Sequence, residues 1–291
     1  MLTERVTLYI PVYNAARYLH EVLPAVMAQT YPLAEVLVVD DGSVDDSAHI
    51  VEQATATARY PMRLIRHDRN RGLGAARNTA IEHTTTPIIA AIDSDVVLEP
   101  DWLATLLPLL REPGIAGAGG RLIERYVIGP GDVWRDTFMR QSHGDVAREV
   151  GGLFGSNTVF WTDMLRSVEG YDPRCRTNGE DAIMAERLKA IGLRFRYTPD
   201  ARCWHLRQDT VPSIMNTFWR WLYFSKQDEK LVVSKVLRSS VQNFRDLFWT
   251  MSRSIRAGKL SCVWIALLLP FYRSCKDWQC YVVARKKGGS V

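Results

Sequence analysis

Two short apolar runs in this chain each end in a cluster of aspartates. The run at 36–39 is followed by D-D-G-S at 40–43, and the run at 87–92 is followed by D-S-D at 93–95. Runs of this kind are typical of strands that are buried on both faces of a parallel sheet. Because ligands of open α/β sheets bind at the carboxyl ends of the strands, we expect both clusters at a ligand-binding edge. An isolated D-x-D sequence is also common in solvated turns, which is the plain alternative.

Strand-like and helix-like stretches alternate through the first third of the chain. Short β-branched runs predict the strands, and the stretches between them predict helices. The predicted order is strand 6–10, helix 15–29, strand 35–39, helix 44–58, strand 62–66, helix 73–83 and strand 87–92. This alternation indicates an α/β fold with a Rossmann-like, mostly parallel sheet and helices on both faces.

Eight motifs resemble those of the family-2 glycosyltransferases. In chain order they are I-P-V-Y-N at 10–14, V-D-D-G-S-V-D at 39–45, N-R-G-L-G-A-A-R-N at 70–78, D-S-D at 93–95, F-G-S-N at 154–157, G-Y-D at 170–172, N-G-E-D-A-I-M-A-E-R-L at 178–188 and His205. Each motif is weak alone, but together they follow the expected order over residues 5–205. The resemblance implies a GT-A fold and an inverting enzyme of the hexosyltransferase type, which moves a sugar from a nucleoside diphosphate sugar to a hydroxyl acceptor.

The resemblance also implies where the nucleotide-sugar donor binds. Asp41 matches a carboxylate that accepts a hydrogen bond from the nucleobase, so a UDP-sugar is the expected donor; the alternative is that Asp41 holds the turn before Gly42. Arg77 is expected to be mainly structural. Ser156 and Asn157 are expected to line the acceptor or the donor sugar. The expected donor-binding residues are Pro11, Val12, Tyr13, Asn14, Asp41, Gly72, Asp93, Ser94, Asp95, Ser156, Asn157, Glu180 and Arg220.

The D-S-D motif predicts a metal site. Two carboxylates at a strand end suit a divalent cation that carries phosphate oxygens. By the resemblance, Asp95 ligates the cation, Asp93 holds the ribose or a metal-bound water, and His205 is a further ligand from a distant strand. The expected cofactor is Mn²⁺ or Mg²⁺, which neutralises the leaving diphosphate, and an imidazole ligand favours Mn²⁺. The alternative for His205, beside Trp204, is a structural side chain.

Glu180 and Asp181 precede a helical pattern at 182–189. An acid at a helix N-terminus is stabilised by the helix dipole, so capping is the alternative to a catalytic role. In the family, a carboxylate at this point removes the proton from the acceptor hydroxyl, and Asp181 matches that base. Glu180 is expected to contact the acceptor or to support the loop.

The C-terminal part differs from the rest in charge and composition. We expect a GT-A catalytic domain at 1–211, with a nucleotide-sugar half at about 1–95 and an acceptor half at about 96–211, and a helical extension at 212–291. The extension has a net charge of +10 and five of the nine tryptophans, whereas 1–211 carries −5. Such a segment is typical of a surface that contacts anionic lipid headgroups or an acidic acceptor. The alternative is a helix packed on the catalytic domain.

Other features of the extension limit its role. Its apolar run at 262–272 is shorter than the roughly 20 residues that span a membrane. Arg220, a possible diphosphate contact, lies in F-W-R-W, which lacks the leading Gln of the Q-x-x-R-W motif in processive relatives, so single sugar addition is expected. Nucleic acid is not an expected partner, because no recognised motif accompanies the pI of 9.0. The cations expected on its outer face, where charge reversal leaves packing intact, are Arg273, Lys276, Arg285, Lys286 and Lys287.

The cysteines favour a reducing compartment. There are five, an odd number without the spacing of a disulfide framework. Zinc at Cys203 and His205 is disfavoured, since a second close Cys/His pair is missing. With no signal-peptide pattern, we expect a cytoplasmic enzyme, peripheral on the membrane, that acts in polysaccharide biosynthesis on a cell-surface glycan or a lipid-linked precursor. The alternative is a non-catalytic sugar-nucleotide-binding or scaffold protein of the same fold. No motif indicates the donor sugar, the acceptor and linkage, or the oligomeric state.

Overall fold

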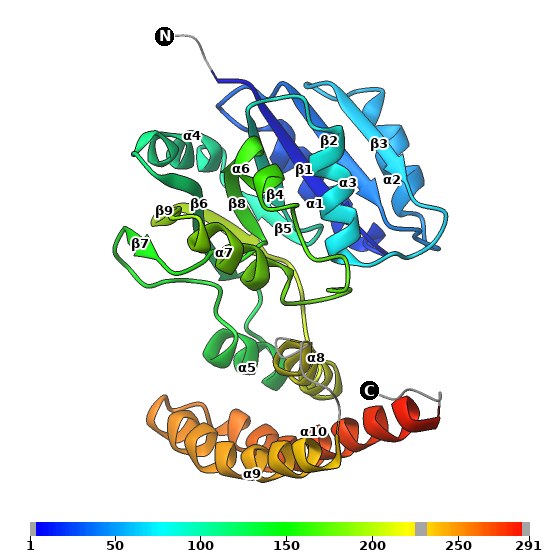
Figure 1. Ribbon diagram of the computed structural model, residues 1–291, viewed down its shortest axis with the longest axis vertical. Helices are drawn as coiled ribbons and strands as arrows, with labels where there is room; N and C mark the ends of the chain where they lie inside the picture. The colour runs from blue at the N-terminus through cyan, green and yellow to red at the C-terminus, as the bar shows by residue number, and fades with distance from the viewer. Residues whose placement is uncertain (1–3, 225–231, 287–291) are drawn as a thin grey trace. The chain divides into compact units, whose positions relative to one another are not determined.

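The structure, a computed structural model, describes residues 4–224 and 232–286 (Figure 1). The chain forms two compact units. The first consists of Met1–Arg125 with Gln141–Leu206, and the second of Tyr126–Arg140 with Arg207–Val291. The sequence pattern did not indicate that residues 126–140 belong with the C-terminal part. The functional division at about 95 and at 211 stays a prediction.

The first unit is built on a sheet with the strand order β3-β2-β1-β4-β8-β6-β9-β5, and β7 pairs with β9. The predicted strands are β1 (Val6–Val12), β2 (Glu35–Asp40), β3 (Met62–Arg66) and β4 (Ile88–Ile92), and all of their mutual pairings are parallel. The remaining strands are β5 (Val96–Leu98), β6 (Ile115–Glu124), β7 (Arg148–Val150), β8 (Asn157–Trp161) and β9 (Arg194–His205). Of their pairings, β6 with β9 is parallel, and β8, β5 and β7 pair antiparallel. The sheet is therefore parallel in its first half and mixed in its second.

Side chains on both faces of this sheet are buried. Leu8 and Tyr9 are consecutive in β1, so they point to opposite faces, and both are at most 1% exposed. This explains the unbroken apolar runs of the sequence. The helices of the first unit are α1 (Ala16–Met27), α2 (Ser47–Thr55), α3 (Leu73–His83), α4 (Trp102–Leu106), the 3₁₀ helix η1 (Leu107–Arg111), α6 (Thr162–Ser167) and α7 (Glu180–Ala190). Apolar residues of α3, α6 and α7 form one cluster with Tyr9.

Strand register brings distant polar residues to one place. Val96 of β5 pairs with His205 of β9, and Glu124 of β6 pairs with the same His205. Earlier in β9, the register is interrupted by a bulge in which residues 198–201 lie opposite the single residue Gly120 of β6. A Cβ on Gly120 would lie 2.1 Å from the carbonyl oxygen of Ala201, so the bulge needs glycine there.

The second unit is helical. It contains α5 (Pro130–Phe138), α8 (Val211–Phe224), α9 (Val233–Arg256) and α10 (Leu260–Lys286). Its core includes Trp134, Phe218, Ile265 and Leu269. The predicted C-terminal helical part is thus confirmed, and the apolar run at 262–272 lies inside α10. Within the described residues, none of the helices combines the length and the apolar character that crossing a membrane requires.

Polar contacts also hold this unit together. Asp277 of α10 accepts hydrogen bonds from Trp219 Nε1 at 2.8 Å and Ser239 Oγ at 2.7 Å, which links α8, α9 and α10. Arg273 is 7% exposed, and its Nη1 lies 3.0 Å from Asp246 Oδ2. The expectation that Arg273 lies on the outer face is therefore wrong, because its charge is paired inside the helical hairpin.

The other predicted outer cations divide into three groups. Lys276 is half-buried, with its Nζ 5.9 Å from the ring centroid of Trp219. Arg285 is exposed as expected. Lys287 and the side chain of Lys286 lie outside the described residues.

Candidate active site

The guanidinium of Arg77 joins three motifs that are far apart in the sequence. Arg77 lies on α3 and is 1% exposed. Its Nη2 donates a hydrogen bond to Asp93 Oδ1 at 2.8 Å, and its Nη1 donates to the carbonyl oxygen of Gly155 at 2.9 Å. Its Nε lies 3.4 Å from Glu180 Oε1. One buried cation therefore connects the D-S-D strand end, the F-G-S-N loop and the start of α7.

Gly155 connects Arg77 to Asp181. The carbonyl of Gly155 accepts from Arg77, while its amide donates to Asp181 Oδ2 at 3.2 Å. The other oxygen of Asp181 accepts from the amide of Ala182 at 2.8 Å, in the first turn of α7. A Cβ at position 155 would lie 2.9 Å from Nη2 of Arg77, so any larger residue there would displace the guanidinium. Two backbone amides thus orient the Asp181 carboxylate.

Glu180 lies in different surroundings from its neighbour Asp181. Its side chain is 5% exposed, and within the described part of the chain its Oε2 has no hydrogen-bond partner. Burial and the charge of Asp181 raise the pKa of Glu180 to about 7, although Arg77 lowers it. Glu180 therefore changes its charge near neutral pH.

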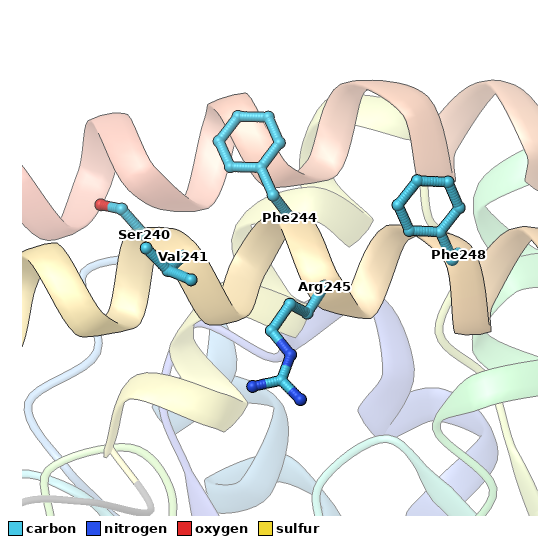
Figure 2. Close-up of a pocket in the computed structure, with 5 residues that line it drawn as sticks. All are labelled: Ser240, Val241, Phe244, Arg245 and Phe248. Carbon is cyan, nitrogen blue, oxygen red and sulfur yellow. The ribbon is translucent and has the colours of Figure 1, made fainter.

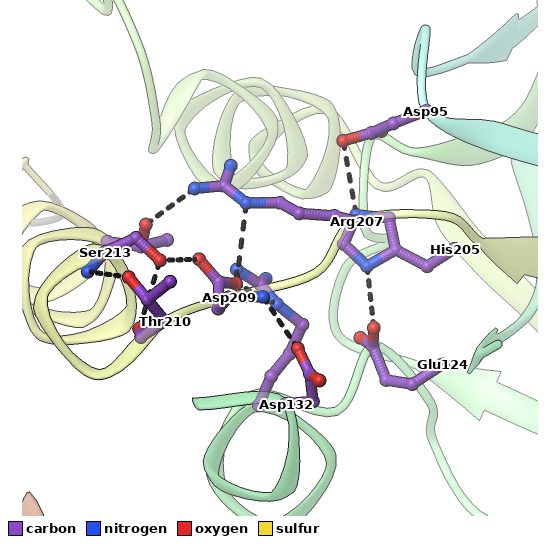
Figure 3. Close-up of polar contacts among 10 residues, drawn as sticks. Asp95, Glu124, Asp132, His205, Arg207, Asp209, Thr210 and Ser213 are labelled. Carbon is purple, nitrogen blue, oxygen red and sulfur yellow. Dashed lines mark hydrogen bonds and ion pairs between the residues drawn. The ribbon is translucent and has the colours of Figure 1, made fainter. Parts of the chain in front are cut away.

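His205 lies between two carboxylates (Figure 3). Its Nε2 is 3.3 Å from Asp95 Oδ2, and its Nδ1 is 2.9 Å from Glu124 Oε2. Burial lowers the pKa of His205, but the two carboxylates outweigh this and raise it to about 9. Sequence reasoning paired His205 with Asp95 but missed Glu124, because only the register of β6 with β9 reveals it.

The acidic residues of the site form one electrostatic cluster. Burial raises the pKa of Asp93, Arg77 opposes this rise, and the carboxylates of Asp95 and Asp181 add to it. Ser94 between the two aspartates is half-buried. The predicted metal ligand Asp95 and the predicted base Asp181 therefore act on the same side chain, Asp93.

Two family models match the chain. The model described as Glycosyl transferase family 2 matches residues 7–167, and the model described as Glycosyl transferase family group 2 matches residues 88–284. The chain belongs to the family-2 glycosyltransferases.

Curated relatives of this glycosyltransferase include two proteins of Haloferax volcanii. The glucosyl-dolichyl phosphate glucuronosyltransferase is 25% identical over 236 residues, which are 74% of this chain and 75% of the relative. Glycosyltransferase AglE is 37% identical over 126 residues, which are 43% of this chain and 41% of that protein. The chain therefore covers most of the first relative but less than half of the second.

Solved structures share the fold. A mannosyltransferase from Pyrobaculum calidifontis, in complex with GDP-Man and Mn²⁺, superposes with a TM-score of 0.60 at 21% identity, over 100% of this chain and 77% of that one. S. aureus TarS 1-349, in complex with UDP-GlcNAc, superposes with a TM-score of 0.57 at 17% identity, over 74% of this chain and 64% of that one. The predicted GT-A fold of this glycosyltransferase is confirmed.

Asp41 of the glycosyltransferase holds the loop before α3. Its Oδ1 is 2.7 Å from His67 Nδ1 and accepts from the amide of Arg71 at 2.8 Å, and its Oδ2 accepts from the amide of Gly72 at 2.8 Å. Gly72 has a φ of +100°, and a Cβ there would lie 2.7 Å from Cα of Arg176. The structural role considered for Asp41 therefore has direct support, and its contact with a nucleobase stays a prediction.

The first two strand-end loops are bonded to each other. Pro11 and Val12 are buried in β1 rather than in the loop, whereas Tyr13 is 49% exposed. Asn14 has a φ of +51°, and its Oδ1 accepts from the amide of Val44 at 2.9 Å. The arrangement leaves Tyr13 accessible at the edge of the sheet, and donor binding by these four residues stays a prediction.

Ser156 and Asn157 are buried and bind within the chain. Ser156 is 3% exposed and donates to Oε1 of Gln141. Asn157 is 1% exposed and accepts from the amide of Gly120 at 2.8 Å. These contacts order the loop that contains Gly155, and a contact of either side chain with sugar stays a prediction.

Arg220 belongs to α8 in the second unit. Burial and the neighbouring cation Arg207 lower the pKa of Arg220. Nearby, Arg207 Nε lies 3.5 Å from Asp209 Oδ2, and Ser213 donates to Oδ1 of Asp209 at 2.6 Å (Figure 3). The predicted contact of Arg220 with the donor diphosphate stays a prediction.

Proposed function

We propose that this glycosyltransferase catalyses the inverting, metal-dependent transfer of a hexose from a UDP-sugar to a hydroxyl acceptor. The contacts of Arg77 carry this proposal, because they bind Asp93 and Glu180 to one guanidinium and, through Gly155, orient Asp181. A direct displacement needs a group that stabilises the leaving diphosphate and a base for the attacking hydroxyl. The cluster supplies candidates for both.

The side chains around Asp95 fit a divalent cation. Asp95 offers a carboxylate oxygen and His205 offers Nε2, while Glu124 contacts Nδ1 and so orients the ring. This donor set suits Mg²⁺ or Mn²⁺, and the imidazole favours Mn²⁺. In residues 4–224 and 232–286, no three His, Cys, Asp or Glu side chains form a metal centre, so phosphate oxygens and water would complete the coordination. When bound, the cation neutralises the departing diphosphate.

Asp181 is the proposed base. It begins α7, and the amides of Gly155 and Ala182 donate to its two oxygens. These amides orient the carboxylate, so that an oxygen can accept the proton of the acceptor hydroxyl as that hydroxyl attacks the anomeric carbon. Glu180 is proposed to support this arrangement through Arg77, together with a role in donor binding.

The proposed donor is a UDP-sugar, on the resemblance of Asp41 to a nucleobase-binding carboxylate. The neighbouring structures were solved with GDP-Man in one case and UDP-GlcNAc in another. An experiment that identifies the donor should therefore include both UDP-sugars and GDP-sugars. We propose the remaining predicted residues, from Pro11 to Arg220, as the surroundings of this donor.

The proposed acceptor is a cell-surface glycan or a lipid-linked precursor at the cytoplasmic face of a membrane. One relative is named a glucosyl-dolichyl phosphate glucuronosyltransferase, whose named substrate is a lipid-linked sugar. Another is named a poly-beta-1,6-N-acetyl-D-glucosamine synthase, at 22% identity over 75% of this chain. Both names support a role in the assembly of surface glycans.

A panel of nucleotide sugars, scored by release of free nucleotide, tests the proposal. We expect release from a UDP-sugar that requires a divalent cation and stops with chelator. Release from a GDP-sugar alone would overturn the proposal that the donor is a UDP-sugar. No release from any donor, combined with donor binding by calorimetry, would favour the non-catalytic binding protein.

A further inference from the structure

Helix α9 carries a stripe of exposed apolar side chains (Figure 2). They recur every three or four residues over most of the helix, which places them on one side of it. Phe248 is 76% exposed and Val241 is 62% exposed, values far above those of core residues. The members of the stripe are Leu237, Val241, Phe244, Phe248 and Ile255.

Helix α10 carries a second stripe, which adjoins the first. Trp264 is 72% exposed and Leu260 is 70% exposed. The rings of Phe244 and Phe271 meet edge to face, with their centroids 5.1 Å apart, so the two stripes form one surface. The members of the second stripe are Leu260, Trp264, Leu268 and Phe271. We call the two stripes together the hairpin face.

Cations border the hairpin face. Arg238, Arg245 and Arg256 are exposed, and each directly follows a member of the α9 stripe in sequence, which puts all three on the same edge of it. The carboxylates of this hairpin are engaged internally: Asp246 pairs with Arg273, and Asp277 accepts from Trp219 and Ser239. The face therefore combines apolar side chains with a positive rim.

We infer that the hairpin face binds the surface of an anionic lipid bilayer, with α9 and α10 lying in the plane of the interface. An apolar stripe bordered by arginines, with Trp and Phe among its members, matches the apolar boundary and the anionic headgroups of such a bilayer. A second copy of the chain is a poorer partner, because a symmetric pairing with its axis across the helices would bring the two positive rims together, and the other symmetric pairing would leave both rims without an anionic partner. The inference rests on the proposed function, because binding of the hairpin face to a bilayer would hold the enzyme where a lipid-linked acceptor lies.

Co-sedimentation of the full chain with vesicles tests the apolar part. We expect binding to phosphatidylcholine vesicles that contain phosphatidylglycerol, and at least tenfold weaker binding to phosphatidylcholine alone or at high salt. Phe248→Ser with Trp264→Ser should weaken binding at least tenfold. The matched control is Val146→Ser with Ile191→Ser, which removes two exposed apolar side chains from the first unit and should bind like the wild type. Circular dichroism confirms that both variants are folded.

A second pair of variants tests the rim. Replacement of Arg238, Arg245 and Arg256 by Gln should weaken binding roughly 100-fold, from the usual contribution of a basic side chain near an anionic surface. Replacement of Arg63, Arg111 and Arg194 by Gln changes the net charge equally, at half-exposed sites of the first unit. This control variant shows whether vesicle binding depends on the position of the charges or only on the net charge. It should bind vesicles much more tightly than the variant that lacks the three rim arginines.

The outcomes separate this inference from the proposed function. Asp181→Asn should bind vesicles normally even if it is inactive, and Phe248→Ser with Trp264→Ser should hydrolyse soluble donor at the wild-type rate. A wild type that ignores anionic vesicles, or binding that survives the apolar variant, would overturn the inference. A dimer in light scattering that dissociates with Phe248→Ser, without vesicle binding, would assign the face to a second copy instead.

Discussion

Arg77 Nη2 donates a hydrogen bond to Asp93 Oδ1 at 2.8 Å, from a side chain that is 1% exposed. Arg77 is structural, as the sequence suggested, but what it supports is the candidate active site itself. Its Nε also lies 3.4 Å from Glu180 Oε1. The buried cation thus compensates two acids from separate motifs, and its removal would leave both without their partner.

Replacement of Arg77 by Met should destabilise the fold by about 3 kcal/mol at pH 8, because breaking a buried ion pair leaves an uncompensated charge. Urea unfolding measures this change. The control is Arg63→Met, whose partner Glu35 is in a half-exposed pair, and which should cost less than about 1 kcal/mol. Adding Glu180→Gln to Arg77→Met should recover part of the lost stability. If the wild type, the two single variants and the double variant were equally stable, Arg77 would not be compensating the buried acids.

Gly155→Ala should lower turnover roughly 10²-fold, because a Cβ 2.9 Å from Arg77 Nη2 shifts the guanidinium and with it the loop that orients Asp181. Steady-state kinetics measure this effect. Gly151→Ala is the matched control, because its Cβ would meet no atom within 4 Å. If both variants keep wild-type turnover, the close contact at position 155 has no catalytic consequence.

Asp181→Asn keeps the shape of the side chain but removes the proton acceptor, so turnover should fall by roughly 10²-fold or more. Donor affinity, measured by calorimetry, should be nearly unchanged. Asp163→Asn, at an 87% exposed side chain, serves as the control and should be fully active. Wild-type transfer by the Asp181 variant would remove it from the mechanism.

Chelator should silence the wild type, and Mn²⁺ or Mg²⁺ should restore it. Asp95→Ala should abolish metal-dependent nucleotide binding, whereas His205→Ala should weaken metal affinity less severely, since one of several ligands is lost. Titration of metal into each protein with nucleotide present measures both effects. Activity that survives exhaustive chelation would show that the metal assignment of D-S-D is wrong.

The pKa of Glu180, about 7 against an ordinary 4.5, predicts a pH dependence of stability. A carboxyl with a raised pKa in the folded state binds its proton more tightly there, so its contribution is fully present below pH 4.5 and is lost as the pH rises through 7. The stability of Glu180→Gln relative to the wild type should therefore increase from pH 5 to pH 8. Thermal unfolding at several pH values gives the difference. A pH-independent difference at Glu180 would contradict the prediction.

The sequence predicts the first half of the fold closely. The strand at 62–66, which is only partly buried, and the helix of small residues at 73–83 occur at the predicted residues, because both leave local patterns in the sequence. The grouping of residues 126–140 with the C-terminal helices could not be predicted. It depends on the tertiary contact of Arg135 with Asp209, which no local pattern records.

The candidate site was predictable in its acids but not in its connections. Asp95, Asp181 and His205 were found from motifs, whereas Glu124 and the role of Gly155 depend on strand register and on backbone hydrogen bonds. Ser156 and Asn157 look like ligand-binding residues by type, yet both are buried against the chain. A motif indicates which residues have a role, but it does not show whether a polar side chain binds a ligand or forms hydrogen bonds that order its own loop.

The bulge of β9 at 198–201 limits how this enzyme can be re-engineered. Because side chains alternate along a strand, adding or deleting one residue between the bulge and His205 would turn the imidazole to the opposite face of the sheet. Segment exchanges between homologues should therefore keep the length of this stretch unchanged. Chimaeras that change this length would lose the contact of His205 with Asp95, the proposed metal-binding pair, even if every motif residue were retained.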